Sequence, residues 1–358
     1  MEIADQKSAM KALAWVLFLC FAIIGFFPVI MHLVDPKMDF LFLGSKFLDF
    51  KSGGGPYGVG AMLLSLVVPL GAGLALSMYY RSTTRKHIEL RNELEKLEKE
   101  FSGSLFLLGN KVEDGIPVEI AFAKVGEVLE DTATGNFFRK VSTNLQKLGM
   151  SLKEAIFDST VGAIREYPSP LIESSMKVLV EGARKGGAIV AKSMITISTY
   201  VDKVRKVNER LNDLLSDIIS SMRSQISFLT PVIAGIVVGV SSMVVVIINR
   251  LSDQFANLEQ ASDLGGLAGI ANIINIKDVI PGFQFQIVVG LYVLEITLIL
   301  IFLANGIERG IDPVYTRYDV GKTLAKSMGL YFVVSLAGII LFNMLASAVT
   351  VAAASTGA

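Results

Sequence analysis

The pattern of hydrophobic and polar positions divides the chain into long apolar stretches and one long charged segment. A helix that spans a bilayer needs about 20 predominantly apolar residues. Stretches of that length occur at residues 12–31, 58–80, 226–248, 284–304 and 327–351. The sequence therefore predicts an all-α membrane protein with five transmembrane helices.

The charged segment between the second and third stretches repeats its apolar side chains with helical spacing. Separations of 4, 3 and 4 residues, typical of a helical seam, connect Leu90, Leu94, Leu97 and Phe101. A longer stripe follows at Ile197, Val201, Val204, Asn208, Leu211, Leu215, Ile218 and Met222. Its polar member either fixes the register of packed helices or is a solvated position on a bundle helix. We expect two long stalk helices, one on each side of a helical bundle.

Glycine and proline residues mark turns between shorter helices in this segment. Gly115 is expected to end one helix, and Pro117 to open the next at its first position, where the missing amide costs nothing. Gly186 and Gly187 mark a further break. The simplest interpretation of these residues is structural, because each has the chemistry of a turn.

A similar turn is predicted at Gly149. This glycine follows an apolar stripe, where it can adopt positive φ at the end of a helix. Ser151 and Glu154 then form the S-x-x-E pattern of a capping box, in which the two residues satisfy each other's backbone amides. The sequence therefore predicts a tight helical hairpin here.

Composition and charge indicate a membrane protein and the side of the membrane on which each terminus lies. The 358 residues are 52% hydrophobic with mean hydropathy +0.56, which is more apolar than an ordinary soluble protein. The 33 basic and 33 acidic residues cancel, so the net charge says nothing about nucleic acid, and we expect no nucleic-acid partner. Residues 81–223 contain 22 of the Lys and Arg side chains, and residues 327–358 contain none. Because basic residues favour the cytoplasmic side, we expect a cytoplasmic N-terminus and an extracytoplasmic C-terminus.

The predicted spans thus divide the chain into three regions. Residues 1–80 form an N-terminal membrane region with two spans, and residues 226–358 form a C-terminal one with three. Residues 81–225 form a cytoplasmic helical domain with its stalk helices. Within the third span, Gly235 and Gly239 make a G-x-x-x-G pattern, which favours close packing with another helix.

The sequence lacks the residue patterns that catalysis and cofactor binding need. It contains no G-x-x-x-x-G-K-[ST] loop, no G-x-G-x-x-G motif and no G-x-S-x-G nucleophile elbow. His32 and His87 do not have ligand spacing, and Cys20 is the single cysteine. We therefore expect a protein that is not an enzyme, with no catalytic residue, no cofactor and no metal site.

Glu295 stands out because it lies near the middle of the fourth predicted span. An acidic group at that depth costs about 2.5–3.5 kcal/mol on insertion scales, so it should face protein or water. It is either a coupling or proton-handling group, or a protonated carboxyl that bonds a neighbouring helix. A polytopic transporter or channel subunit that uses Glu295 is therefore an alternative function.

Three phrases in the charged segment resemble the F domain of type II secretion and type IV pilus platform proteins. They are "DGIPVEIAFAKV" from Asp114, "KLGMSLKEAIFD" from Lys147 and "VLVEGARKGGAIVAKSM" from Val178. In that family, glycine-containing helical hairpins precede an E-G…G phrase and a long helix that enters the membrane. The match covers residues 100–225 and the following span. The arrangement is similar to archaeal platform proteins, including those of the archaellum.

The resemblance implies a platform protein of the cytoplasmic membrane that couples a separate assembly ATPase to pilin-like subunits. Bacterial platforms usually have two cytoplasmic F domains and three spans. This chain has one such domain, five predicted spans and a short second cytoplasmic loop at 305–326. The resemblance therefore also implies a homo-oligomer, such as a dimer, or a pairing with another platform chain.

Two charged surfaces are the predicted contacts with the ATPase. The first consists of the hairpin tips, whose charged candidates are Glu119, Lys153 and Glu154. The second is the short loop, with Arg309, Asp312, Arg317 and Lys322. Polar surfaces of this kind set partner choice more than raw affinity. The alternative for the loop is a solvated segment on the positive side of the membrane.

Overall fold

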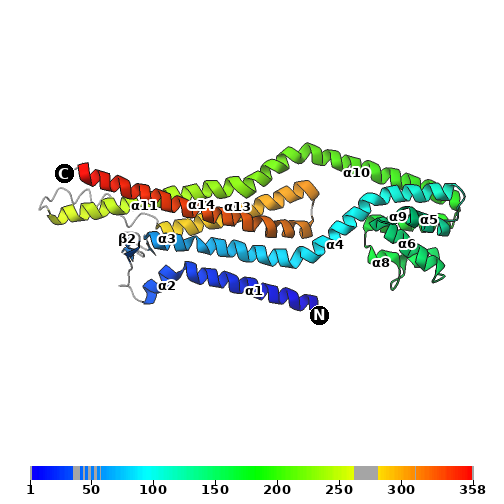
Figure 1. Cartoon of the computed structure of the whole chain (residues 1–358), viewed down its shortest axis with the longest axis horizontal. Coiled ribbons are helices and arrows are strands. Elements are labelled where there is room, and N and C mark those ends of the chain that lie inside the picture. Colours follow the sequence, from blue (N-terminus) through cyan, green and yellow to red (C-terminus); the bar gives the residue numbers. More distant parts are fainter. Residues whose placement is uncertain are drawn as a thin grey trace. The chain divides into compact units, whose positions relative to one another are not determined.

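Helices dominate the protein (Figure 1). The computed structural model describes residues 2–34, 41–42, 45–46, 50–51, 55–56, 58–261, 281–310 and 312–356. The chain forms two compact units. Unit 1 combines Met1–Arg85 with Asp217–Ala358, and unit 2 is Lys86–Ser216.

Five described segments are long and apolar enough to cross a membrane, as the sequence predicts. They are Ser8–Gly25, Val59–Arg85, Gly187–Ile248, Gly282–Arg309 and Pro313–Ala346. A chain with these five apolar segments is compatible with a multi-pass membrane protein.

The first predicted span, at 12–31, is not one helix. α1 (Glu2–Gly25) ends before α2 (Phe27–Val34) begins. Pro28 is the reason, because a proline inside a continuous helix removes one hydrogen bond and clashes with the preceding turn. In the first turn of α2, Pro28 removes no helical hydrogen bond and has no preceding turn to clash with. Two short antiparallel hairpins follow, in which β1 (Leu41–Phe42) pairs with β2 (Ser45–Lys46) and β3 (Phe50–Lys51) pairs with β4 (Gly55–Pro56).

The second predicted span, at 58–80, is part of a longer helical segment. Only Leu66 separates α3 (Val59–Ser65) from α4 (Val67–Glu113). The 47 residues of α4 begin in unit 1 and end in unit 2. At 1.5 Å per residue they rise about 70 Å. The expected continuation of the second span into a stalk helix is therefore confirmed.

The third predicted span also continues directly from a helix of unit 2. α10 (Gly187–Ser224) passes through a π-helical turn, η1 (Gln225–Leu229), into α11 (Thr230–Ala261). Pro231 explains the wider turn, since its ring would clash with the carbonyl four residues earlier in a regular α-helix. α11 extends beyond the predicted end at residue 248, and residues 262–280 lie outside the described residues.

The fourth and fifth predicted spans lie in α13 (Gly282–Arg309) and α14 (Pro313–Thr356). The prediction of a loop at 305–326 is wrong, because both helices extend into it and only residues 310–312 separate them. Gly310 makes this tight junction possible with φ of 72°, a conformation that glycine adopts without a Cβ clash.

Glycines bring α11 and α14 together in unit 1. A Cβ atom added at Gly239 would lie 2.9 Å from the Cα atom of Gly338, and one added at Gly235 would lie 2.7 Å from Val334 Cγ1. Small residues let helices approach closely where lipid removes the usual hydrophobic drive for association. The predicted G-x-x-x-G packing face is therefore confirmed.

Hydrogen bonds between side chains join α14 to α11 and to α13. Asn343 Nδ2 of α14 donates to Ser242 Oγ of α11 at 2.9 Å. Thr297 Oγ1 of α13 and Ser327 Oγ of α14 are buried and lie 3.2 Å apart. Such bonds satisfy polar groups in a low-dielectric environment and contribute about 0.6 kcal/mol each on average.

Unit 2 has a core of aromatic and aliphatic side chains instead. Phe101, Phe122, Phe137 and Phe138 are fully buried in it. The rings of Phe137 and Phe138 pack edge to face, with centroids 5.6 Å apart. Besides its parts of α4 and α10, the unit contains α5 (Val118–Val128), α6 (Ala133–Gln146), α7 (Leu152–Phe157), α8 (Ala163–Glu166) and α9 (Pro170–Ala183).

The predicted turns of unit 2 are confirmed. Gly115, Gly149 and Gly186 have φ of 85°, 64° and 115°, where a side chain would be strained. Gly187 is the first residue of α10. One detail differs, because Pro117 is the N-cap of α5 and not its first residue.

The predicted stripe on α10 is not a continuous buried seam. Val204, Leu211 and Ile218 are 41%, 49% and 53% exposed, whereas Ile219 is 8% exposed. A strict seven-residue repeat drifts by about 20° per heptad on a straight helix, so one stripe does not stay on one face. Asn208 is exposed, as expected of a solvated position.

Candidate functional site

A groove of about 870 Å³ lies in unit 2 beside the turn between α4 and α5. Residues of two predicted turns, Gly115 and Gly187, both line it. Its apolar lining includes Val112, Ile116, Ala188, Ala191 and Ile195, and its charged lining consists of Glu113, Glu119 and Lys192. An apolar groove with a few charged groups is suited to binding a peptide segment or helix of a partner.

The α4–α5 turn owes its shape to a Schellman motif. The amide of Gly115 donates to the carbonyl of Val112 at 3.1 Å, and the amide of Ile116 donates to the carbonyl of Lys111 at 3.2 Å. The positive φ of Gly115 makes this pair of bonds possible. Ile116 consequently turns back against the core, on the lining of the groove.

A second glycine sets the separation of α4 and α10 beside the groove. A Cβ atom added at Gly109 would lie 2.7 Å from Ile195 Cγ1 and 3.1 Å from the carbonyl oxygen of Ala191. One added at Gly187 would lie 3.5 Å from Val112 Cγ1. The two helices therefore approach closely, and the turns before α5 and α10 become neighbours.

The charged side chains of the groove are available to a partner. Glu113, Glu119 and Lys192 are all exposed. Among the residues that the structure describes, no ion pair involves these three side chains. Opposite charges at the edge of an apolar surface give orientation and partner choice.

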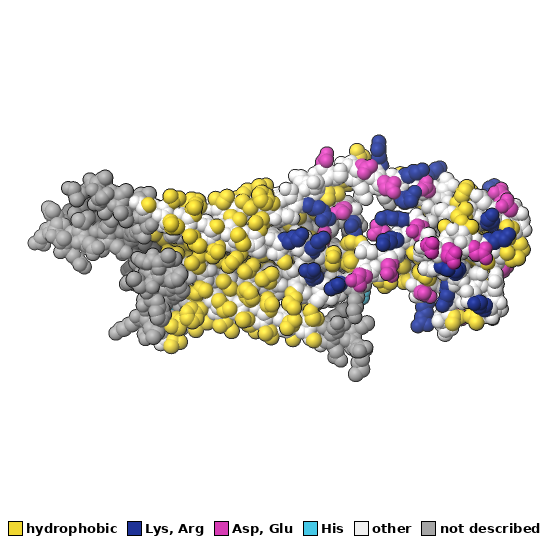
Figure 2. Space-filling model, in the orientation of Figure 1, with side chains coloured by type: hydrophobic (Ala, Val, Ile, Leu, Met, Phe, Trp, Pro, Cys, Tyr) yellow, Lys and Arg dark blue, Asp and Glu magenta, His cyan; other side chains and the backbone are white. Residues whose placement is uncertain are grey.

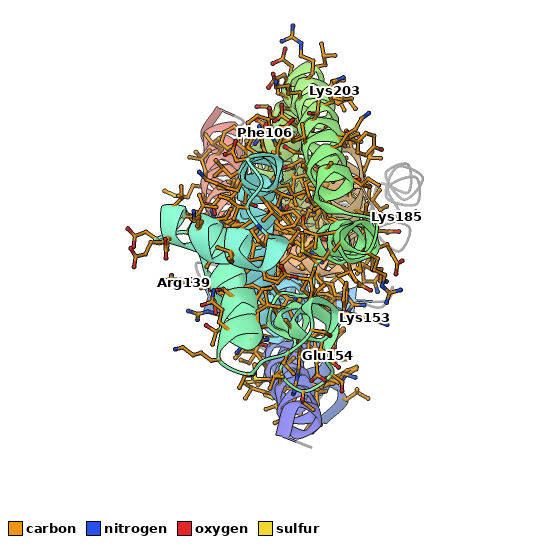
Figure 3. The ribbon with its side chains drawn as sticks, turned by 90° about the vertical axis from the view of Figure 1, so that its right-hand side faces the viewer. Phe106, Arg139, Lys153, Glu154, Lys185 and Lys203 are labelled. Atoms are coloured by element: carbon orange, nitrogen blue, oxygen red, sulfur yellow. The ribbon has the colours of Figure 1, made fainter. Side chains whose placement is uncertain are left out.

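The second predicted hairpin tip does not join this groove. Lys153 and Glu154 are exposed in α7 but do not line it. In Figure 3 they lie beside each other, while Arg139 lies on the opposite side of the view. The structure therefore pairs the Gly115 turn with the Gly186–Gly187 turn rather than with the Gly149 turn.

Glu154 also has a structural role in its own turn. The amide of Ser151 donates to Glu154 Oε2 at 3.0 Å, and the hydroxyl of Ser151 donates to it at 2.8 Å. These two bonds lower the pKa of Glu154 below its usual value. The amide of Glu154 donates to Ser151 Oγ at 3.4 Å, which completes the predicted capping box.

The other predicted partner surface lies in unit 1, where α13 and α14 meet. Arg223 pairs with Glu308 and lies 3.4 Å from Asp319 Oδ2. Arg309 Nε lies 3.6 Å from Glu308 Oε1, and its guanidinium lies 3.8 Å from the centre of the Tyr315 ring. These contacts order the junction without a partner, since they join it to the end of α10.

The other three predicted residues of this segment, Asp312, Arg317 and Lys322, differ in whether their side chains are engaged within the protein. Asp312 Oδ1 accepts from the amides of Val314 at 3.0 Å and Tyr315 at 3.3 Å, so this side chain caps α14. Arg317 and Lys322 are exposed on α14. Among the described residues, no ion pair involves either of these two cations.

A smaller pocket of about 200 Å³ lies in unit 1 between the ends of α10, α13 and α14. Its lining includes Arg223, Asp319, Lys322 and Lys326. Apart from Lys322, these residues were not predicted from the sequence as members of a site. The i, i+3, i+7 spacing of Asp319, Lys322 and Lys326 on one face of α14 was the available signal.

Glu295 lies on the outward face of α13. It is exposed, together with Leu291 and Ile299 at 58% and 53% exposure, while Leu294 and Thr297 are buried. Within the described ranges no hydrogen bond or ion pair involves its carboxyl. Among the described residues, Glu295 therefore does not bond a neighbouring helix, and no other predicted site residue pairs with it.

Comparison with known proteins identifies no relative of this chain. A scan against protein-family models, a search of curated proteins and a search of solved structures all find no match. Any function assigned to the chain therefore depends on its own residues and their geometry.

Proposed function

We propose that the chain is a membrane platform protein of a type IV pilus-like, archaellum-like or type II secretion machine. It couples a separate cytoplasmic assembly ATPase to the insertion of pilin-like subunits. The observation that carries this proposal is the groove of unit 2. Two of the three family-like phrases, around Gly115 and around Gly187, line this one groove.

The chemistry of the groove supports a protein partner. Its lining gives a partner apolar contacts at Val112 and Ile195, while Glu119 and Lys192 supply opposite charges. Interfaces derive most of their binding energy from such desolvated apolar centres, and charged rims add orientation. The ATPase contributes a complementary helix or loop and carries out the nucleotide chemistry.

Two continuous helices support a mechanical role. α4 begins in unit 1 and ends beside the groove at Glu113. α10 begins at Gly187 in the same groove and continues through η1 into α11. Because a helix keeps its length, a displacement of the groove is passed along both elements toward the apolar segments.

The orientation follows from the basic residues. Unit 2 and the α13–α14 junction lie in the cytoplasm, the N-terminus is cytoplasmic, and the C-terminus is extracytoplasmic. Arg317 at the junction is a second contact for the ATPase.

Since one chain has a single domain of this kind, it works as a homodimer or beside another platform chain. A transporter that uses Glu295 has less support, because Glu295 is exposed and forms no ion pair among the described residues.

The test is binding of the purified, detergent-solubilised chain to the candidate assembly ATPase of the same cell. Ala188→Trp fills the groove, and we expect about ten-fold weaker binding or more, because central apolar contacts carry over 1 kcal/mol. Glu119→Lys should weaken binding less and change its salt dependence. Glu127→Lys is the control, since it makes the same charge change on the exposed side of α5 outside the groove. Equal binding by all four proteins would reject the proposal.

A further inference from the structure

The pocket of about 200 Å³ in unit 1 has the chemistry of an anion site. Two hydroxyl side chains, Ser227 and Thr323, and three cations, Arg223, Lys322 and Lys326, line it. Ile226, Ile301 and Ala304 form its apolar side. A single small pocket thus combines hydrogen-bond donors and positive charge with an apolar wall.

The cations are not neutralised to the same degree. Arg223 pairs with Glu308 and Asp319. In the part of the chain that the structure describes, no ion pair involves Lys322 or Lys326. Both lysines are exposed and lie one turn apart on α14. Asp319 is the acidic residue of the lining, and it lies 3.4 Å from Arg223. The two lysines therefore bring positive charge to the pocket that Asp319 does not pair with in the described residues.

The pocket lies where the apolar surface ends. Hydropathy alone puts the ends of three predicted spans at Ile226, Ala304 and Ser327, and these are pocket residues or the immediate neighbour of one. Figure 2 shows Lys and Arg side chains gathered at the edge of the hydrophobic surface. In a membrane this is the depth of the lipid headgroups.

We propose that this pocket binds the phosphate of an anionic lipid headgroup. Lys322 and Lys326 neutralise the phosphate, the hydroxyls of Ser227 and Thr323 donate to its oxygens, and an acyl chain follows Ile226 and Ile301. Basic pockets between membrane helices on the cytoplasmic side are suited to such headgroups. The volume suffices for a phosphate, since one water molecule occupies about 30 Å³ of liquid.

This site rests on the membrane location in the proposed function but not on the ATPase. The lipid site can therefore be tested even if the chain binds no ATPase. A bound lipid would also brace α10, α13 and α14 against one another at the level where α10 enters the apolar region.

The experiment measures lipid retained by the full chain after purification into detergent doped with phosphatidylglycerol or with phosphatidylcholine, using native mass spectrometry. We expect the wild-type chain to retain phosphatidylglycerol and not phosphatidylcholine. Lys322→Gln and Lys326→Gln should each weaken retention about five-fold. Arg317→Gln removes one exposed charge from the same helix outside the pocket and should leave retention unchanged.

Two further measurements keep the result unambiguous. Lys322→Arg should restore retention, which separates lost charge from a misfolded helix. Inorganic phosphate should not raise the melting temperature as phosphatidylglycerol does at equal phosphate concentration. Equal retention by Lys322→Gln and Arg317→Gln, or equal stabilisation by free phosphate, would overturn the proposal.

Discussion

The two units of the protein differ in the most prominent contacts inside each of them. In unit 1, α11 and α14 meet through Gly239 and Gly338 and through the hydrogen bond between Asn343 and Ser242. In unit 2, large aromatic side chains such as Phe137 and Phe138 fill the core. Small residues and polar bonds are what helices use in lipid, whereas buried aromatic area is what stabilises a fold in water. The contacts of unit 1 are compatible with helices in a membrane, as its apolar segments are.

The outer surfaces differ in the same sense. α13 exposes large apolar side chains such as Val288 and Phe302, at 65% and 59% exposure. The exposed faces of unit 2 also expose apolar side chains such as Val128, at 64%, but they carry ion pairs beside them, for example between Lys177 and Glu173 at 2.7 Å. Such surface pairs contribute little stability, but they keep a surface compatible with water.

The largest effect is expected at the glycine contact of unit 1. Gly239→Leu would push side-chain atoms into the backbone of Gly338, from which an added Cβ is already only 2.9 Å away. We expect loss of monodisperse protein in size-exclusion chromatography. Gly329→Leu is the control, because a Cβ atom there meets nothing within 4 Å. If both variants behave alike, close packing does not hold unit 1.

Truncation of the aromatic core is expected to have the next largest effect. Phe137→Ala removes a fully buried ring and should lower the free energy of unfolding of unit 2 by about 3–5 kcal/mol. Hydrogen exchange of amides in α6 reports this loss in the full chain. Phe106→Ala is the matched control, since Phe106 is 46% exposed in the same unit (Figure 3). A similar loss in both would contradict an aromatic core.

A smaller effect is expected at the α7 turn. Ser151→Ala removes the side chain that accepts from the amide of residue 154 and should cost about 0.5–2 kcal/mol. Faster exchange of amides in α7, with unchanged exchange in α5, would locate the loss. Ser159→Ala, at an exposed neighbouring position, serves as the control. Uniform exchange across both helices would show that the cap does not matter.

Acid should have the smallest effect, again confined to the α7 turn. Bonds from Ser151 lower the pKa of Glu154, and bonds from the hydroxyl and amide of Thr160 lower the pKa of Asp158. A carboxyl with a lowered folded pKa stabilises the fold above its ordinary pKa, about 4, and loses that contribution as the pH falls through the folded value. Protection of α7 amides, measured relative to their intrinsic exchange rate at each pH, should therefore fall below about pH 4. Glu154→Gln with Asp158→Asn should flatten this dependence.

Local chemistry made the turns and spans predictable. The capping box at Ser151 and the positive φ at Gly115 and Gly149 depend on a few adjacent residues. The five apolar stretches follow from hydropathy. The packing of Gly235 and Gly239 was also predictable, because the pattern lies on one helix, although its partner α14 was not.

Contacts between distant segments could not be predicted. The groove joins Gly115 to Gly187 across 72 positions of sequence, and no local pattern indicates that pairing. The ion pair between Arg223 and Glu308 also joins residues far apart in the sequence, so no local pattern indicates it. The outward position of Glu295 depends on which face of α13 packs inward, and several faces of that helix are apolar.

The most direct test of the platform account is site-specific photo-crosslinking in intact membranes. A photoreactive amino acid at Ala188, in the groove, should give an adduct with the assembly ATPase. The same amino acid at Glu127, on the exposed side of α5, should give none. An adduct at both positions, or at neither while the ATPase remains bound to the membrane, would contradict docking in the groove of unit 2.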